Sequence, residues 1–182
     1  MKRIGFLLGS FDPVHIGHIY MATEALNNDL VDEVIFVPTF QNPWKDKSTD
    51  FHKRCLMLEM AITPLENCKI SMIEQTLTAP YYSYNTLNAL SKQCVNDDLY
   101  LIVGADVVTE IPHWNNGSWI LSNYRLITVR RDGYDYKAAL DIPNTLNVSS
   151  TYIRDLYKQK KQVYPLVPKE LDVYIKKYKI YE

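Results

Sequence analysis

The chain has 182 residues, 47% of them hydrophobic and 23% charged, and its 20 Lys and Arg against 21 Asp and Glu give a formal net charge of −1. This balance argues against a protein that coats nucleic acid or an anionic membrane, because such proteins usually carry a large basic excess. The apolar content excludes a disordered chain. A chain of this length favours one compact core, so we predict a single domain over residues 1–182.

The cysteines and the N-terminal segment bear on the cellular compartment. Cys55, Cys68 and Cys94 are widely spaced, and none forms a Cys-x-x-Cys pair or has a His at metal-ligand spacing. They are predicted to be buried thiols. The apolar run Ile4–Leu8 is too short for the core of a signal peptide, and no stretch of about 18 apolar residues is present. We therefore expect a cytoplasmic protein with no membrane partner.

Short apolar runs alternate with amphipathic stretches from the N-terminus onward. The apolar runs predict buried strands at Ile4–Leu8, Val34–Val37, Ile70–Ile73, Leu99–Val103 and Leu126–Val129. Helical spacing between them predicts three apolar helix faces, made of Ile19, Ala22, Ala25 and Leu26, of Leu56, Met60 and Thr63, and of Leu87, Leu90 and Cys94. Residues 149–158 and 168–178 are predicted to form two closing helices.

This alternation predicts an α/β fold, a Rossmann-like doubly wound parallel sheet of about five strands with helices on both faces. In such sheets ligands bind outside the carboxyl ends of the strands, where the winding reverses. Functional residues are therefore expected in the segments after Leu8, Val37 and Val103.

The first predicted strand leads into a loop with features of an anion site, running from Gly9 to His18 before a helix. Gly9 lets backbone amides approach a ligand, Ser10 offers a hydroxyl, and the helix N-terminus adds free N–H groups. A phosphate group is the expected occupant.

His15 and His18 are three residues apart, which places both imidazoles on one face of a helix, and Gly17 between them removes a side chain that would block access. Two donors without a carboxylate suit the stabilisation of charge on phosphate oxygens, as phosphoryl or nucleotidyl transfer requires. The alternative is that one histidine caps the helix while the other packs in the core.

Three further segments carry candidate site residues. Ser149–Thr151 open a helix, and Arg154 lies where the helix dipole disfavours a cation, so a bound anion would explain it. The alternative is a plain Ser/Thr cap beside a surface arginine. Lys45 follows a Pro-rich loop that could close over phosphates, or is a solvated surface charge.

Trp114 and Asp106 also have two interpretations each. Trp114 is a large aromatic residue in a loop, where it either packs or binds a ligand. Asp106 follows a buried strand and either caps a helix or contacts a ligand.

The sequence Gly-Ser-Phe-Asp-Pro-x-His-x-Gly-His at residues 9–18 resembles the signature of the nucleotidyltransferase superfamily. Members of that superfamily transfer an adenylyl or cytidylyl group from a nucleoside triphosphate to a phosphorylated acceptor. Class I aminoacyl-tRNA synthetases also carry His-Ile-Gly-His, but this chain has no Lys-Met-Ser-Lys-Ser loop and no room for a tRNA-binding region.

Further segments resemble one branch, the bacterial nicotinate-nucleotide adenylyltransferases. They are Val37–Lys45, Tyr82–Leu87, Gly104–Asp106 with Trp114, Ser149–Arg154, Tyr164–Pro168, Val173–Ile175 and Tyr181. Two departures stand out: the family usually has two glycines before a threonine where this chain has Leu8, Gly9 and Ser10, and Trp44 replaces the histidine before Lys45.

The resemblance implies an enzyme that uses ATP and nicotinate mononucleotide as substrates, and Mg²⁺ to offset the charge of the triphosphate without protein side chains as ligands. It implies His15 and His18 as catalytic residues. The implied ATP- and phosphate-binding residues are Gly9, Ser10, Phe11, Lys45, Gly104, Asp106, Ser149, Ser150, Thr151 and Arg154. The implied pyridine nucleotide-binding residues are Tyr82, Ser83, Thr86 and Trp114, with Trp114 stacked on the pyridine ring.

Alternatives remain open at this point. The acceptor could instead be nicotinamide mononucleotide or pantetheine phosphate, and a non-catalytic nucleotide-binding module would keep the same binding positions. A homo-oligomer is compatible with a small enzyme, but nothing in the charge or heptad pattern identifies an interface.

Overall fold

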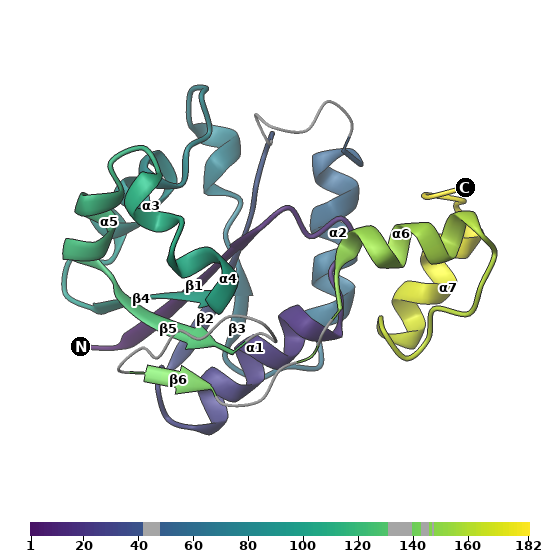
Figure 1. The fold of residues 1–182 in the computed structure, drawn as a ribbon, viewed down its shortest axis with the longest axis horizontal. Helices are drawn as coiled ribbons and strands as arrows, with labels where there is room; N and C mark the ends of the chain where they lie inside the picture. The colour runs from purple at the N-terminus through teal and green to yellow at the C-terminus, as the bar shows by residue number, and fades with distance from the viewer. Residues whose placement is uncertain (42–47, 131–139, 143–145, 147) are drawn as a thin grey trace.

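The computed structural model describes residues 1–41, 48–130, 140–142, 146 and 148–182. It contains a six-stranded sheet in the order β3-β2-β1-β4-β5-β6, and each neighbouring pair is parallel. The strands are β1 (Arg3–Gly9), β2 (Glu33–Pro38), β3 (Cys68–Ile70), β4 (Asp98–Gly104), β5 (Arg125–Val129) and β6 (Leu140–Ile142). The winding reverses between β1 and β4, which confirms the predicted doubly wound α/β fold (Figure 1).

Helices cover both faces of the sheet, and side chains that alternate along each strand feed two cores. Leu7 and Ile102 point into the first core, whereas Phe6 and Leu101 point into the second. The first core is covered by α1 (Ile16–Asn27), α2 (Phe51–Ile62), α6 (Ser150–Lys158) and α7 (Lys169–Lys177). The second is covered by η1 (Ile73–Thr76), α3 (Ser83–Gln93), α4 (Ala105–Val108), η2 (Ile111–His113) and α5 (Gly117–Asn123).

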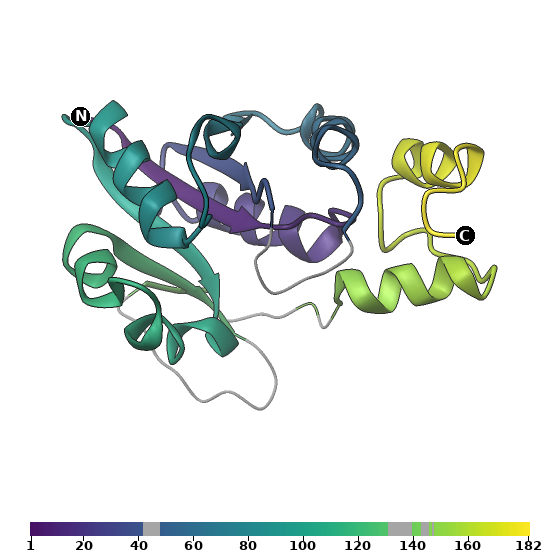
Figure 2. The ribbon, with the colours of Figure 1, turned by 90° about the horizontal axis from the view of Figure 1, so that it is seen from above.

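The C-terminal pair of helices lies to one side of the sheet, with α7 packed against α2 (Figure 2). This brings the segment after residue 150 close to the loop that follows β1, because α6 begins beside that loop (Figure 1). Both closing helices agree with their predicted ranges.

The predicted edge strand Ile70–Ile73 is wrong in its bounds, because β3 ends at Ile70 and Ile73 begins the 3₁₀ helix η1. Only three residues pair with Val34–Phe36, and Ile73 turns inward to join the second core. The strand β6 was not predicted, because three residues with a central aspartate show no apolar run.

The predicted apolar face of the second helix is also wrong. Leu56 is 42% exposed, whereas the buried face of α2 holds Arg54, Cys55 and Leu58. Because Arg54 is charged, the sequence pattern did not identify this face of α2 as the buried one. The faces predicted for α1 and α3 are confirmed, with Ala22, Ala25, Leu87 and Leu90 buried.

All three cysteines are free; Cys55 is buried, and Cys68 and Cys94 are half-buried. Burial raises the pKa of Cys68 to about 11. Among the described residues, none of the helices combines the length and hydropathy needed to cross a bilayer. The single-domain organisation stays a prediction.

Candidate active site

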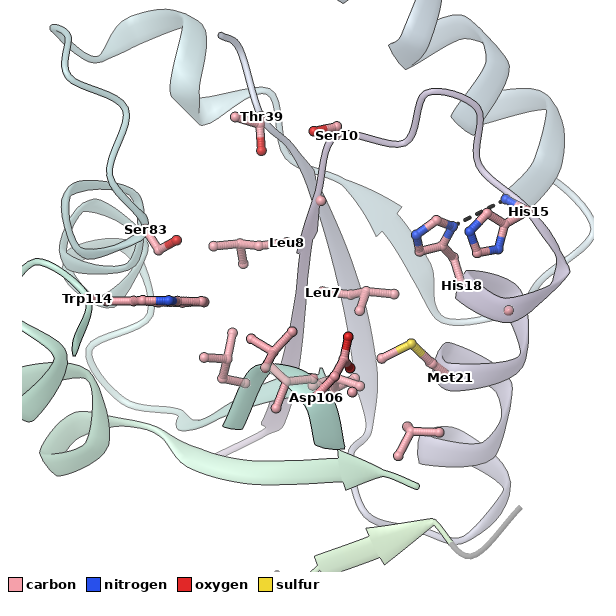
Figure 3. A pocket seen from close by; sticks show the side chains of 18 of the residues that line it. Leu7, Leu8, Ser10, His15, His18, Met21, Thr39, Ser83, Asp106 and Trp114 are labelled. Atoms are coloured by element: carbon pink, nitrogen blue, oxygen red, sulfur yellow. Dashed lines mark hydrogen bonds between the residues drawn. The ribbon is translucent and has the colours of Figure 1, made fainter. Parts of the chain in front are cut away.

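A cavity of about 550 Å³ lies at the carboxyl ends of β1 and β4, where the strand order reverses (Figure 3). Its floor is formed by the ends of these two strands, and α1 forms one wall. The opposite wall is formed by the start of α3 and by the segment after η2. The sheet topology predicts a ligand site at this position.

Nine of the residues implied by the sequence resemblance line this cavity together. They come from the β1–α1 loop, α1, the β4–α4 junction, α3 and the segment after η2, namely Gly9, Ser10, His15, His18, Tyr82, Ser83, Gly104, Asp106 and Trp114. Figure 3 shows the histidines on the α1 side of the cavity, with Trp114 and Ser83 facing them from the other side. The fold thus assembles residues that are more than 90 positions apart in the chain.

The two histidine rings are stacked, with centroids 3.8 Å apart and an interplanar angle of 29°. His18 Nδ1 accepts a hydrogen bond from the backbone N–H of His15 at 3.2 Å (Figure 3). Because Nδ1 is the acceptor, a neutral His18 ring carries its proton on Nε2, which makes Nε2 a donor. The same hydrogen bond occupies one of the free N–H groups at the start of α1.

Phe11 packs against His18 and is not among the residues that line the cavity. Its side chain is 1% exposed, and the edge of its ring meets the His18 ring with centroids 4.9 Å apart. Its φ of 47° is in the left-handed region, which is uncommon for an aromatic residue. The loop therefore holds Phe11 in a strained backbone conformation, in contact with the ring of a candidate catalytic histidine.

Gly17 is required by packing. A Cβ atom built on Gly17 would lie 3.0 Å from His15 Nδ1 and 3.0 Å from a methyl group of Val148. The missing side chain at Gly17 therefore leaves room for the His15 ring. The sequence alone predicts only that Gly17 leaves access to the two histidines open.

On the opposite wall, Tyr82 and Ser83 begin α3 and line the cavity. Thr86 does not line it, because its side chain is fully buried and its hydroxyl donates to Glu74 Oε1 at 2.7 Å. Trp114 is half-buried; it packs against the second core, as one interpretation expected, and it also lines the cavity, so ligand binding by Trp114 stays a prediction.

The predicted anion site at the start of α6 makes different contacts. Ser149 caps the helix by accepting from the backbone N–H of Tyr152, as the alternative interpretation expected. Ser150 Oγ donates to the carbonyl of Pro13 at 2.9 Å, and Arg154 Nη1 donates to the carbonyl of Asp12 at 2.8 Å. These donors hold the β1–α1 loop.

Arg154 Nη2 also donates to Thr151 Oγ1, and neither residue is among the described residues that line the cavity. Lys45 and Trp44 lie outside the described residues. Phosphate binding by Lys45 and by Ser149–Arg154 therefore stays a prediction.

Comparisons with known proteins show the family of the chain. The profile of the cytidylyltransferase-like family matches residues 6–156. A nicotinate-nucleotide adenylyltransferase from Bacillus subtilis is 34% identical over the full length of both chains. A probable nicotinate-nucleotide adenylyltransferase from Methylacidiphilum infernorum is 30% identical over 98% of this chain and 92% of that protein.

The chain belongs to the nicotinate-nucleotide adenylyltransferase family. The fold is also similar to that of the nicotinic acid mononucleotide adenylyltransferase of Plasmodium falciparum complexed with NaAD, with a TM-score of 0.85 at 20% identity, covering 100% of this chain and 98% of that chain. A second structure of the Plasmodium enzyme, complexed with APC, gives a TM-score of 0.82 at 19% identity, with the same coverage.

Arg54 is a structural residue of this family member that the sequence analysis missed. Its side chain is 1% exposed and donates to four backbone carbonyls. Nη1 reaches Ser10 at 2.6 Å, Nη2 reaches Thr39 at 2.8 Å and Phe40 at 3.1 Å, and Nε reaches Thr49 at 2.8 Å. Burial lowers the pKa of Arg54, which the nearby charge of Asp12 opposes. One guanidinium thus joins the segments that follow β1 and β2.

Glu74 is the second residue missed, because it follows a predicted strand and carries no motif. It lines the cavity although its side chain is 2% exposed. Its Oε2 accepts from the backbone N–H of Phe40 at 2.8 Å, and its Oε1 accepts from Thr86. Burial raises the pKa of Glu74 above its ordinary range, and these two hydrogen bonds oppose that change.

Among the described residues, no group of three or more His, Cys, Asp or Glu side chains could hold a metal ion. The cavity is lined by imidazoles and hydroxyls, which can donate to phosphate oxygens, and by the carboxylates of Glu74 and Asp106. The use of Mg²⁺ with ATP, without protein side chains as ligands, stays a prediction.

Replacing Arg54 with Met should lower the free energy of unfolding by about 3–5 kcal/mol, because it removes a buried guanidinium that donates to four partly buried backbone carbonyls. Urea denaturation measures this change. Arg54→Lys should recover only part of it, since an ammonium cannot reach all the carbonyls at once. The exposed neighbour gives the control: Lys53→Met should stay within about 0.5 kcal/mol of the parent. Equal effects at both positions would contradict the structural role of Arg54.

The raised pKa of Glu74 predicts a specific pH dependence of stability. The folded protein holds this proton more tightly than the unfolded chain, so the stability that it contributes is complete below about pH 4.5 and is lost as the pH rises through the folded-state pKa. Glu74→Gln lacks this titration. The difference in free energy of unfolding, parent minus Glu74→Gln, should therefore be smaller at about pH 7 than at about pH 4. A difference that grows with pH would show that the folded state lowers the pKa of Glu74 instead.

Proposed function

We propose that this chain transfers the adenylyl group of ATP to nicotinate mononucleotide, giving nicotinate adenine dinucleotide and pyrophosphate in NAD biosynthesis. The observation that carries the proposal is the stacked pair His15 and His18 lining the cavity of a chain that belongs to the nicotinate-nucleotide adenylyltransferase family. The named relatives and the Plasmodium structures with NaAD and APC support the same substrate class.

In the reaction an oxygen of the acceptor phosphate attacks the α-phosphorus of ATP in line. The new O–P bond forms as the bond to the β-phosphate oxygen breaks, and pyrophosphate leaves with that electron pair. The acceptor phosphate is already anionic, so no protein base is needed. Catalysis therefore rests on positioning and on donors aimed at the phosphate oxygens.

The histidines supply those donors in the proposed mechanism. His18 Nε2–H faces the oxygens on which charge develops, because Nδ1 is held by the backbone of His15. Ser10 and the amides around Gly9 hold the α-phosphate at the start of α1, where the helix dipole favours negative charge. These groups are in place before the substrate arrives and need no reorganisation during the reaction.

The opposite wall is proposed to bind the pyridine nucleotide. The positively charged pyridine ring stacks on Trp114, with Tyr82 and Ser83 beside it. Thr86 contributes by holding Glu74 in the wall and does not contact the ring through its side chain. Gly104 and Asp106 also line the cavity, where Asp106 can accept hydrogen bonds from nucleotide hydroxyls.

The remaining members of the predicted set belong to the phosphate side. When bound with ATP, Mg²⁺ would offset the charge of the triphosphate. Lys45, Ser150 and Arg154 are proposed to meet the leaving pyrophosphate. A cytoplasmic location and self-association remain predictions.

Pyrophosphate release tests the proposed function directly. The purified protein is given ATP with nicotinate mononucleotide, nicotinamide mononucleotide or pantetheine phosphate in turn. We expect the largest kcat/KM with nicotinate mononucleotide, since the full-length relatives carry that name. A preference for pantetheine phosphate would move the protein to another transferase branch, and ATP binding without product from any acceptor would support a non-catalytic module.

His18→Ala should lower kcat about 100- to 1,000-fold with little change in ATP affinity, because it removes a donor needed mainly in the transition state. Steady-state kinetics and equilibrium binding of ATP separate the two effects. His52→Ala is the matched control, since His52 is exposed and is not among the residues that line the cavity. Turnover of His18→Ala within threefold of the control would refute the role of His18.

A further inference from the structure

The Tyr181 side chain reaches back to the loop that precedes the two histidines. Its hydroxyl donates to Asp12 Oδ1 at 2.7 Å, although the two residues are 169 positions apart in the chain. Both side chains are buried, with 8% and 7% exposure. Burial and the neighbouring Asp12 carboxylate raise the pKa of Tyr181, so the hydroxyl keeps the proton that it donates.

Asp12 is held from several directions. Its Oδ2 accepts from the backbone N–H of Thr49 at 3.1 Å, and its carbonyl accepts from Arg154. A buried carboxylate needs such partners, because an unpaired one loses its hydration without compensation. Among the described residues, Tyr181 is the donor to the other carboxylate oxygen, Oδ1, so its loss would take a hydrogen bond from a buried carboxylate.

The position of Asp12 is transmitted to the site through Phe11. Phe11 is the adjacent residue, has the left-handed φ of 47°, and places its ring edge against His18. A strained backbone conformation of this kind persists only where the surrounding contacts fix it. If Asp12 loses a contact, the strained backbone of Phe11 can relax. The packing of the Phe11 ring against the His18 ring then changes.

We propose that Tyr181 is a positioning residue of the adenylyl transfer reaction, which sets the orientation of His18 by fixing Asp12 and, through it, Phe11. This inference rests on the proposed function. Tyr181 does not line the cavity among the described residues, so it acts on the geometry of a donor rather than on a substrate. Its removal should therefore change kcat and leave substrate binding almost unchanged.

Tyr157 gives a closely matched control. Its ring stacks on Tyr181 with centroids 5.8 Å apart, and it is 4% exposed. Its hydroxyl also donates to a carboxylate, that of Asp172, at 3.0 Å. Asp172 belongs to α7, so this second hydrogen bond stays within the C-terminal helices and does not reach the β1–α1 loop. The two stacked tyrosines thus make similar hydrogen bonds to carboxylates, but only that of Tyr181 reaches the β1–α1 loop.

The test compares Tyr181→Phe with Tyr157→Phe in the full chain, since each substitution removes one oxygen and keeps the stacked rings. Thermal unfolding should show similar decreases in Tm. We expect kcat of Tyr181→Phe to fall about tenfold, because small misplacements of a catalytic group cost that much. KM for ATP and for nicotinate mononucleotide should stay within about twofold, and Tyr157→Phe should keep kcat within about twofold of the parent.

Amide hydrogen exchange provides a readout that does not depend on activity. Exchange in residues 10–15 should accelerate in Tyr181→Phe and not in Tyr157→Phe. Equal kcat values for the two variants, or equal exchange in this loop, would overturn the positioning role. An inactive parent protein with the expected difference in exchange would instead refute the proposed function while leaving the contact chain intact.

Discussion

The guanidinium of Arg54 is the interaction on which the candidate site depends. A cation at 1% exposure survives in the interior only if its donors are used, and Arg54 uses them on the carbonyls of Ser10, Thr39, Phe40 and Thr49. Those carbonyls belong to irregular backbone, which has no strand or helix partners of its own. The planar fork of an arginine can serve several carbonyls from one point, and a lysine cannot. The edge of the sheet that carries the candidate site is therefore fixed by a residue that is not among those lining the cavity.

Glu74 extends this framework to the other wall. Its carboxylate joins Phe40, which Arg54 also holds, to Thr86 in α3. The two sides of the cavity are thus connected through buried polar groups, each with a partner. Such networks specify a single arrangement at the cost of severe penalties when one member is lost. This suits a reaction in which geometry, rather than covalent chemistry by the protein, accounts for the rate.

The parallel sheet and the histidine loop could be predicted because their signals are local. Apolar runs such as Leu99–Val103 identify strands. The spacing of His15 and His18 correctly predicted that the two rings lie together, although His15 is the N-cap of α1 with an extended backbone and only His18 lies within the helix. Arg54 could not be placed, because a charged residue lowers the apolar pattern of the helix face that it shares with Cys55 and Leu58. An arginine at helical spacing inside such a stripe is the signal that would have found it.

Long-range contacts account for the other differences. The pattern at Ser149–Arg154 correctly predicted a helix start, but the destination of its donors, the carbonyls of Asp12 and Pro13, depends on the tertiary fold. Likewise the strain at Phe11 is visible only in the backbone. Residue types indicate which groups can donate, whereas packing decides what they donate to.

The contact between Asp12 and Tyr181 has a consequence for how the protein is made. Asp12 is synthesised before its partner Tyr181, which follows 169 positions later. A nascent chain can therefore pair β1 with β2 and β4 and bring both histidines to the sheet edge before the contact that secures their loop exists. The loop would be secured only after Tyr181 has been synthesised, so a chain stalled before Tyr181 would pair these strands without the contact that aligns the histidine loop.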